Sequence, residues 1–357
     1  MFKHVLVGIM ALGVPGLGLT LAGAELDVGG DIRLREEYVD QEDRDERNRL
    51  RFRARVNIKA KVTDQVNAGL RMSSGGDSPI GRNQSLDDSF SLKHINLDRA
   101  FVDWHLDDAP LRVTGGKMAN PMVLARDLVW DSDVTPEGIN LNLGGGEAWA
   151  LDINTGYYVV EERRGDDETT LWGSTATADI AGLHIGVGYF MYDEVKGRGP
   201  VFRDNAFGNT TTHIGEGDDA VEVLANDYGL LEFAASYGAD LGGLPGTIYL
   251  DYVVNHEATS AGDTGYQVGI GIGKVGEPGT WSLDLNYRDL EADAVFATFA
   301  DSSFTGGGTN GEGWKFSGKV QLSRNLQAAF ACFINRIDPG GEAMDYHRLH
   351  VDLSARF

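Results

Sequence analysis

The stretch Leu50–Val62, LRFRARVNIKAKV, alternates between apolar and polar side chains. Because successive side chains of a strand point to opposite faces, this stretch as a strand has one apolar face and one strongly cationic face. As a helix, steps of about 100° per residue would place apolar residues on opposite sides of the axis, so the pattern excludes a helix. The alternation extends back to Arg47, and the cationic face carries Arg47, Arg49, Arg51, Arg53, Arg55, Asn57, Lys59 and Lys61.

Two environments accommodate such a strand. A soluble sandwich buries the apolar face, whereas a membrane barrel turns it to lipid and turns the cationic face to a water-filled lumen. The same alternation recurs along most of the chain, and after residue 24 no apolar run approaches the roughly 18–20 residues that a spanning helix needs. A closed barrel pairs every backbone group in lipid. We therefore predict an all-β fold, a transmembrane antiparallel β-barrel of about 16 strands over residues 25–357.

Short turns alternate with long loops along the chain. Thr63-Asp64-Gln65 and Arg324-Asn325 are short turns, whereas residues 73–89, 119–137 and 193–219 form long loops. This arrangement is typical of outer-membrane barrels, in which turns lie on the periplasmic side and loops lie outside. Residues 220–225 fit either a short strand or a helical turn. The tryptophans that fall near predicted strand ends, where aromatic girdles lie, are Trp149, Trp172, Trp281 and Trp314.

The N-terminus has the features of a secretory signal peptide. Lys3 supplies a positive start, Val5–Leu21 is apolar, and Ala22-Gly23-Ala24 fits a small-residue cleavage site. A retained membrane anchor is the alternative, but Pro15 and several glycines make this stretch a poor permanent helix. We predict a signal peptide over residues 1–24 and an exported protein.

Composition and motifs exclude several classes of function. Lys and Arg total 31 against 54 Asp and Glu, a net charge of −23, which argues against nucleic acid as a partner. Cys332 is the single cysteine, so no intrachain disulfide forms. The chain has no H-E-x-x-H motif, no G-x-S-x-G motif and no catalytic grouping of Ser, His and acid. We predict no catalytic residue, no cofactor and no metal site. Weak calcium binding by Asp218-Asp219 or by Asp40–Glu46 is less favoured than solvated loop charge.

Two segments resemble known outer-membrane proteins. The C-terminal strand, which ends in Phe357, resembles the terminal strand of Gram-negative outer-membrane proteins. Within Leu97–Gly138, LDRAFVDWHL, VTGGKMANP and DLVWDSDVTPEG resemble a family of bacterial outer-membrane proteins named "putative porins". The resemblance implies a porin in the outer membrane of a Gram-negative bacterium. Porins of this size typically form trimers, so the resemblance also implies a homotrimer.

Closure of the barrel would collect many cations on one wall. The last strand would then lie beside the first, so the wall would combine the series Arg47–Lys61 with Arg33, Arg35, Arg71, Arg348 and Arg356. General porins fold their third loop inward, and by this resemblance we expect residues 119–137 to form a constriction loop. Its acids are Asp127, Asp131, Asp133 and Glu137. Opposed charges across a narrow aqueous gap would orient polar solutes. The alternative is that the cations pair with acids on neighbouring strands and have no effect on which solutes pass.

These features predict an outer-membrane porin that passes small hydrophilic solutes or ions passively and contacts outer-membrane lipid. A substrate-selective channel for anions, such as phosphate or organic acids, is an alternative that the basic wall favours. A plugged structural or adhesive barrel, whose outer loops bind a partner, is a second alternative. An enzyme is the least supported class, because the chemistry is missing.

Overall fold

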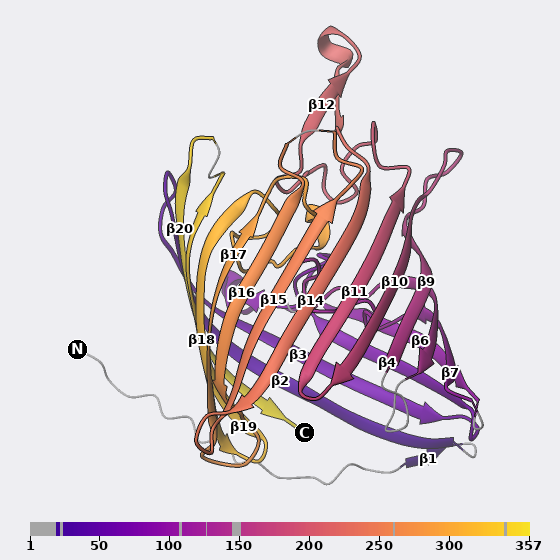
Figure 1. Ribbon diagram of the computed structural model, residues 1–357, viewed down its shortest axis with the longest axis vertical. Helices are drawn as coiled ribbons and strands as arrows, with labels where there is room; N and C mark the ends of the chain where they lie inside the picture. Colours follow the sequence, from indigo (N-terminus) through magenta and orange to yellow (C-terminus); the bar gives the residue numbers. More distant parts are fainter. Residues whose placement is uncertain are drawn as a thin grey trace.

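The computed structural model describes residues 19–21, 24–106, 109–125, 127–144, 151–259, 261–338 and 341–357. They form a closed antiparallel barrel of 16 strands, which confirms the predicted fold class (Figure 1). Two short strands, β1 (Leu19–Leu21) and β5 (Gln84–Ser85), pair with this sheet. The rest of the predicted signal peptide, apart from Ala24, lies outside the described residues.

The barrel strands are β2 (Ala24–Gln41), β3 (Arg47–Lys61), β4 (Val66–Ser74), β6 (Ile95–His105), β7 (Leu111–Lys117), β8 (Glu137–Gly144), β9 (Leu151–Glu161), β10 (Thr169–Ile180), β11 (Leu183–Asp193), β14 (Tyr228–Asp240), β15 (Pro245–Asn255), β16 (Thr264–Gly273), β17 (Trp281–Leu290), β18 (Gly311–Ser323), β19 (Leu326–Ile337) and β20 (Met344–Arg356). Three short 3₁₀ helices lie in loops: η1 (Asp88–Phe90), η2 (Gly217–Asp219) and η3 (Ala297–Phe299). None of the helices in the described part of the chain is long and apolar enough to cross a membrane.

The barrel closes where its first and last long strands meet. β2 pairs with β20 over Asp31–Gln41 and with β3 over Glu25–Val39. Short turns and the C-terminus lie at one end of the barrel, and the long loops lie at the other (Figure 1). The hairpin of β12 (Thr211–Ile214) and β13 (Val221–Leu224) projects from the loop end (Figure 1). Residues 220–225, which fit either a short strand or a helical turn in the sequence, therefore contain a strand.

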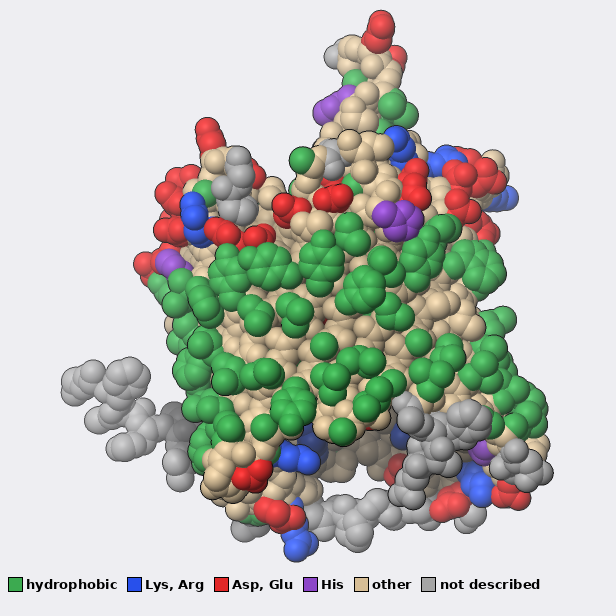
Figure 2. Space-filling model, viewed as in Figure 1, with side chains coloured by type: hydrophobic (Ala, Val, Ile, Leu, Met, Phe, Trp, Pro, Cys, Tyr) green, Lys and Arg blue, Asp and Glu red, His purple; other side chains and the backbone are tan. Residues whose placement is uncertain are grey.

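The outer surface of the barrel is an apolar belt (Figure 2). Apolar residues of alternate positions, such as Ile32, Leu34 and Val351, are exposed on it. Trp172, Trp281 and Trp314 are exposed on this surface as well, whereas Trp149 lies outside the described residues. Acidic side chains gather beyond the belt at the loop end (Figure 2). The alternation therefore presents its apolar face to lipid, as a membrane barrel requires.

Loops supply the apolar core, which lies inside the barrel. The inner loop, residues 118–136 between β7 and β8, contributes buried side chains such as Met122 and Leu128. These pack with wall residues of β9–β11 and with Ala294–Ala300 of the loop that joins β17 to β18. The wall leaves room for the inner loop, because a Cβ atom on Gly173 of β10 would lie only 2.2 Å from the Met122 sulfur. The lumen is therefore partly filled by packed loops.

Candidate functional site: a narrowed lumen with a basic wall

The inner loop crosses the lumen. It leaves the wall at β7 and returns at β8, yet the Asp127 carboxylate pairs with the Lys315 ammonium at 2.6 Å. Lys315 lies on β18, and the ring of paired strands places seven barrel strands between β8 and β18: β9, β10, β11, β14, β15, β16 and β17. An ion pair thus ties the loop to the far side of the barrel.

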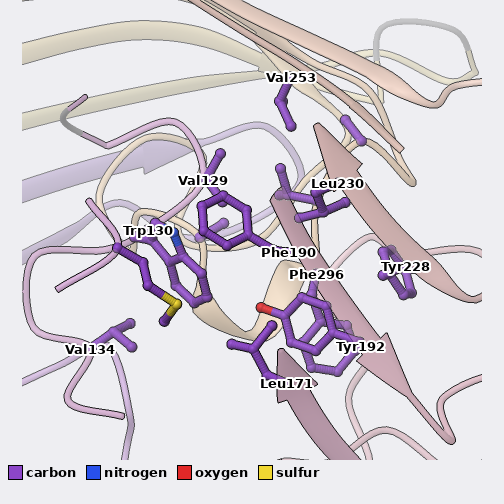
Figure 3. Packing of buried hydrophobic residues seen from close by; sticks show 14 of the residues in the cluster. Val129, Trp130, Val134, Leu171, Phe190, Tyr192, Tyr228, Leu230, Val253 and Phe296 are labelled. Carbon is purple, nitrogen blue, oxygen red and sulfur yellow. The ribbon is translucent and has the colours of Figure 1, made fainter. Parts of the chain in front are cut away.

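Apolar packing holds the middle of the inner loop. Trp130 is 2% exposed and meets Phe190 of β11 edge-on, with ring centroids 5.4 Å apart (Figure 3). It also packs on Phe299 at 6.0 Å. The Asp131 backbone N–H donates to the Phe299 carbonyl oxygen at 2.7 Å. The inner loop and the loop of residues 291–310 therefore form one packed unit within the barrel.

Asp131 is part of this packed unit. Its carboxylate accepts backbone N–H groups of Ser302 at 2.8 Å and Asp133 at 2.7 Å. Burial, with the nearby carboxylates of Asp301 and Asp133, raises the pKa of the Asp131 carboxyl to about 8. The group therefore carries a proton in the packed loop at neutral pH.

This shift predicts pH-dependent loop packing. A displaced loop would ionise Asp131 near pH 3.8, whereas the packed loop keeps the proton up to about pH 8. The packed state thus binds more protons between these values, and its stability falls as pH rises through them. We expect open-channel current noise to increase from pH 5 to pH 9, and Asp131→Asn to weaken that dependence. Equal pH dependence in both proteins would contradict this role. The control is Glu137→Gln, which removes an exposed carboxylate directly after the same loop.

Arginines face the lumen from the barrel wall on both sides of the closure. In register, Arg33 of β2 lies opposite Arg53 of β3, and Arg35 lies opposite Arg51. Like charges directly opposite one another are destabilising, so carboxylates are needed between them. Asp31 accepts from Arg53 at 2.8 Å and from Arg55 at 2.7 Å, and Asp352 of β20 accepts two bonds from Arg35 at 2.6 and 2.7 Å.

Glu37 joins the strands at the closure. It is fully buried and accepts hydrogen bonds from Arg49, from Arg51 at 3.1 Å and from Arg348 of β20 at 2.7 Å. The Nε2 atom of His350 lies 3.3 Å from the same carboxylate. One carboxylate thus links β2, β3 and β20, and this part of the predicted ladder is paired with neighbouring strands.

The other predicted wall residues lie farther along the barrel. Arg47 is exposed at the loop end of β3, and Lys59, Lys61 and Arg356 are exposed toward the turn end. Lys61 pairs with Asp64 at 2.8 Å in the adjoining turn. These four are not among the closely packed arginines.

The four acids of the inner loop have different surroundings. Asp127 reaches β18 and Asp131 lies in the packed unit, as described above. Asp133 interacts electrostatically with Arg33 of the basic wall, and its backbone oxygen accepts a bond from Arg82 at 2.8 Å. Glu137 pairs with Lys117 of β7 at 2.7 Å. Asp133 is therefore the acid of this group that the structure brings to the basic wall.

Sequence reasoning missed Arg82, Asp98 and Arg99. Arg71 lies opposite Arg99 of β6, and Asp98 accepts from Arg71 and, at 2.9 Å, from Arg82. The pairing register shifts between Arg71 and Met72, which places Asp98 and Arg99 beside the same arginine. Arg99 shares the alternation of its strand and could have been found from it. Arg82 lies in a loop, where no periodic signal exists.

Within the described residues, no group of three or more His, Cys, Asp or Glu side chains could hold a metal ion. The side chain of Asp218, one of the acids weighed for calcium, is not described. Weak calcium binding by the outer loops stays an untested alternative.

A closed 16-stranded barrel with short turns at one end, a loop folded inward and a charged wall defines a porin-type channel. A family model described as "Putative porin" matches residues 30–164 and 219–357. The chain belongs to this family, and it is an outer-membrane porin of a Gram-negative bacterium. The predicted class and location are thus confirmed.

Solved structures share the fold at low sequence identity. A mutant of the Rh. blastica porin has a TM-score of 0.57 and 12% identity, covering 93% of this chain and 100% of its own. Pseudomonas putida OprB has a TM-score of 0.60 and 11% identity, covering 93% and 94%. Salmonella typhi OmpF, solved with daunomycin, has a TM-score of 0.57 and 8% identity, covering 94% and 98%. No curated protein matches the chain.

Proposed function

We propose that this porin passes small hydrophilic solutes passively and favours anions. The observation that carries the proposal is an excess of positive charge in one cluster. This cluster, the basic wall, contains ten arginines and five carboxylates: Arg33, Arg35, Arg49, Arg51, Arg53, Arg55, Arg71, Arg82, Arg99 and Arg348, with Asp31, Glu37, Asp98, Asp133 and Asp352.

The basic wall keeps a net positive charge despite its internal ion pairs. Ten arginines against five carboxylates leave a formal excess of five positive charges in the basic wall. The Asp127 carboxylate pairs with Lys315, and the Asp131 carboxyl is protonated in the packed loop, so neither group offsets this excess. A fixed positive field in a narrow aqueous gap attracts anions and repels cations.

Single-channel current in a planar bilayer under a potassium chloride gradient tests the proposal. Stable open steps with a reversal potential toward that of chloride are expected. A reversal potential toward that of potassium would mean that the acidic outer loops, and not the basic wall, set the selectivity. Folded barrel without conductance would overturn the channel and favour a plugged, partner-binding barrel. Heat-dependent electrophoretic mobility reports whether the barrel is folded in each sample.

The proposal includes export through a signal peptide at residues 1–24, no catalytic activity and assembly as a homotrimer. The family and the fold are those of channels, which supports the proposed lack of catalytic activity. Phe90 and Leu92 are almost fully exposed in the loop before β6, and apolar side chains so exposed favour contact with another surface. Sedimentation of the detergent-solubilised protein tests the assembly.

A further inference from the structure

One arginine of the basic wall has no counter-charge of its own. The side chain of Arg99 makes no hydrogen bond or ion pair with any residue in the described ranges, and its Nε atom is buried. The carboxylate that interacts electrostatically with Arg99, that of Asp98, is already occupied. Its Oδ2 accepts from Arg71 and its Oδ1 accepts from Arg82 at 2.9 Å.

The surroundings of Arg99 are also positive. Arg71 lies directly opposite Arg99 across β4 and β6, where facing side chains start about 5 Å apart. Arg55 and Arg82 are its other cationic neighbours. Two guanidinium groups that extend from facing positions repel each other where they come close, unless an anion lies between them.

Donors remain free to hold such an anion. Arg71 is 6% exposed, and its buried Nη2 atom has no hydrogen-bond partner in the described structure. Arg55 uses its Nε atom to bind Asp31 at 2.7 Å, and its side chain is 21% exposed. Arg99 itself is half-buried, so part of its side chain stays accessible to solvent.

We propose that Arg55, Arg71 and Arg99 form a binding site in the lumen for a small doubly charged oxyanion, either a dicarboxylate or phosphate. The planar guanidinium fork matches both carboxylate and phosphate oxygens. Within the described residues around this site, the arginines Arg53, Arg55, Arg71, Arg82 and Arg99 are accompanied by two acids, Asp31 and Asp98. The local excess of three positive charges favours a dianion over a monoanion.

This inference rests on the proposed anion-favouring pore and adds a discrete site to it. A pore without such a site passes anions in proportion to their concentration. A site that holds a dianion instead delays it, so a dianion competes with chloride and the competition saturates. Saturation thus separates a binding site from a general positive field.

The test measures chloride current at constant ionic strength and pH 8 while inorganic phosphate, succinate or acetate is added. We expect phosphate, succinate or both to inhibit saturably and acetate to inhibit much less. Arg99→Gln should raise the half-inhibiting concentration at least about tenfold, because it removes a charge-assisted contact. Arg99→Lys should give an intermediate value, since it keeps the charge and loses the fork.

Arg47→Gln is the matched control, because it removes the same charge from an exposed position on β3. Unchanged inhibition in Arg99→Gln, or no saturation in the parent protein, would overturn the site. Equal inhibition by acetate and succinate would overturn its preference for dianions. The reversal potential of the parent protein is measured in the same bilayers, so a cation-selective pore would overturn the proposed function separately. Phosphate and succinate, added separately, identify the class of ligand.

Discussion

Arg51→Glu combined with Arg53→Glu is expected to convert the anion-favouring pore into one that discriminates little between anions and cations. The two substitutions change the formal charge of the basic wall by four, against an excess of five. A unit charge about 7 Å from a permeating ion contributes about 0.6 kcal/mol in water. About half of this remains after screening at 0.1 M salt. Four charges then shift the energy of an anion by about 1.2 kcal/mol and that of a cation by the same amount in the opposite direction, so we expect the anion-to-cation permeability ratio to fall roughly fiftyfold.

Lys59→Glu with Lys61→Glu is the matched control for this experiment. It makes the same change in charge on the same strand, but at exposed positions toward the turn end. We expect a much smaller shift in reversal potential from it. Glu37 and Asp31 keep other arginine partners in the test variant, namely Arg49, Arg348 and Arg55, so the closure retains ion pairs. Unchanged selectivity in a folded test variant would show that Arg51 and Arg53 do not lie in the narrow part of the pore.

The strands and the direction of the wall arginines were predictable from sequence. A period of two is a local property, and it fixes which side chains of β3 share a face. The register at closure follows once β2 and β20 pair, which brings Arg348 to Glu37. Lipid outside and water inside then decide which face is apolar.

The interior of the barrel was much less predictable. Asp131 was expected to face the basic wall, although its role there stays untested, and the structure places its carboxylate against backbone N–H groups of Ser302 and Asp133. That contact depends on a loop some 170 residues away in sequence, and no local pattern encodes it. The β-bulge at Asp98 of β6, opposite the step from Arg71 to Met72, likewise breaks the period of two and hides the place of Asp98 in the wall.

Trp130→Ala is expected to release the inner loop and increase conductance without unfolding the barrel. Removing a buried tryptophan side chain costs about 3–5 kcal/mol where the cavity does not collapse. The substitution removes the ring contacts of Trp130 with Phe190 and Phe299, which hold the inner loop in place. Its indole N–H has no hydrogen-bond partner within the described residues, so no polar contact is lost. Strand pairing in the wall does not involve Trp130.

The measurement is single-channel conductance and current noise, with heat-dependent mobility as the test of barrel folding. Trp172→Ala is the control, because Trp172 is 57% exposed on the lipid-facing surface and the same atoms are removed. We expect larger and noisier open steps from Trp130→Ala and parental steps from Trp172→Ala. If the folded Trp130→Ala barrel conducts as the parent does, the inner loop does not set the conductance. The narrowest part of the pore would then lie along the wall arginines alone, and Arg51→Glu with Arg53→Glu would change the conductance as well as the selectivity.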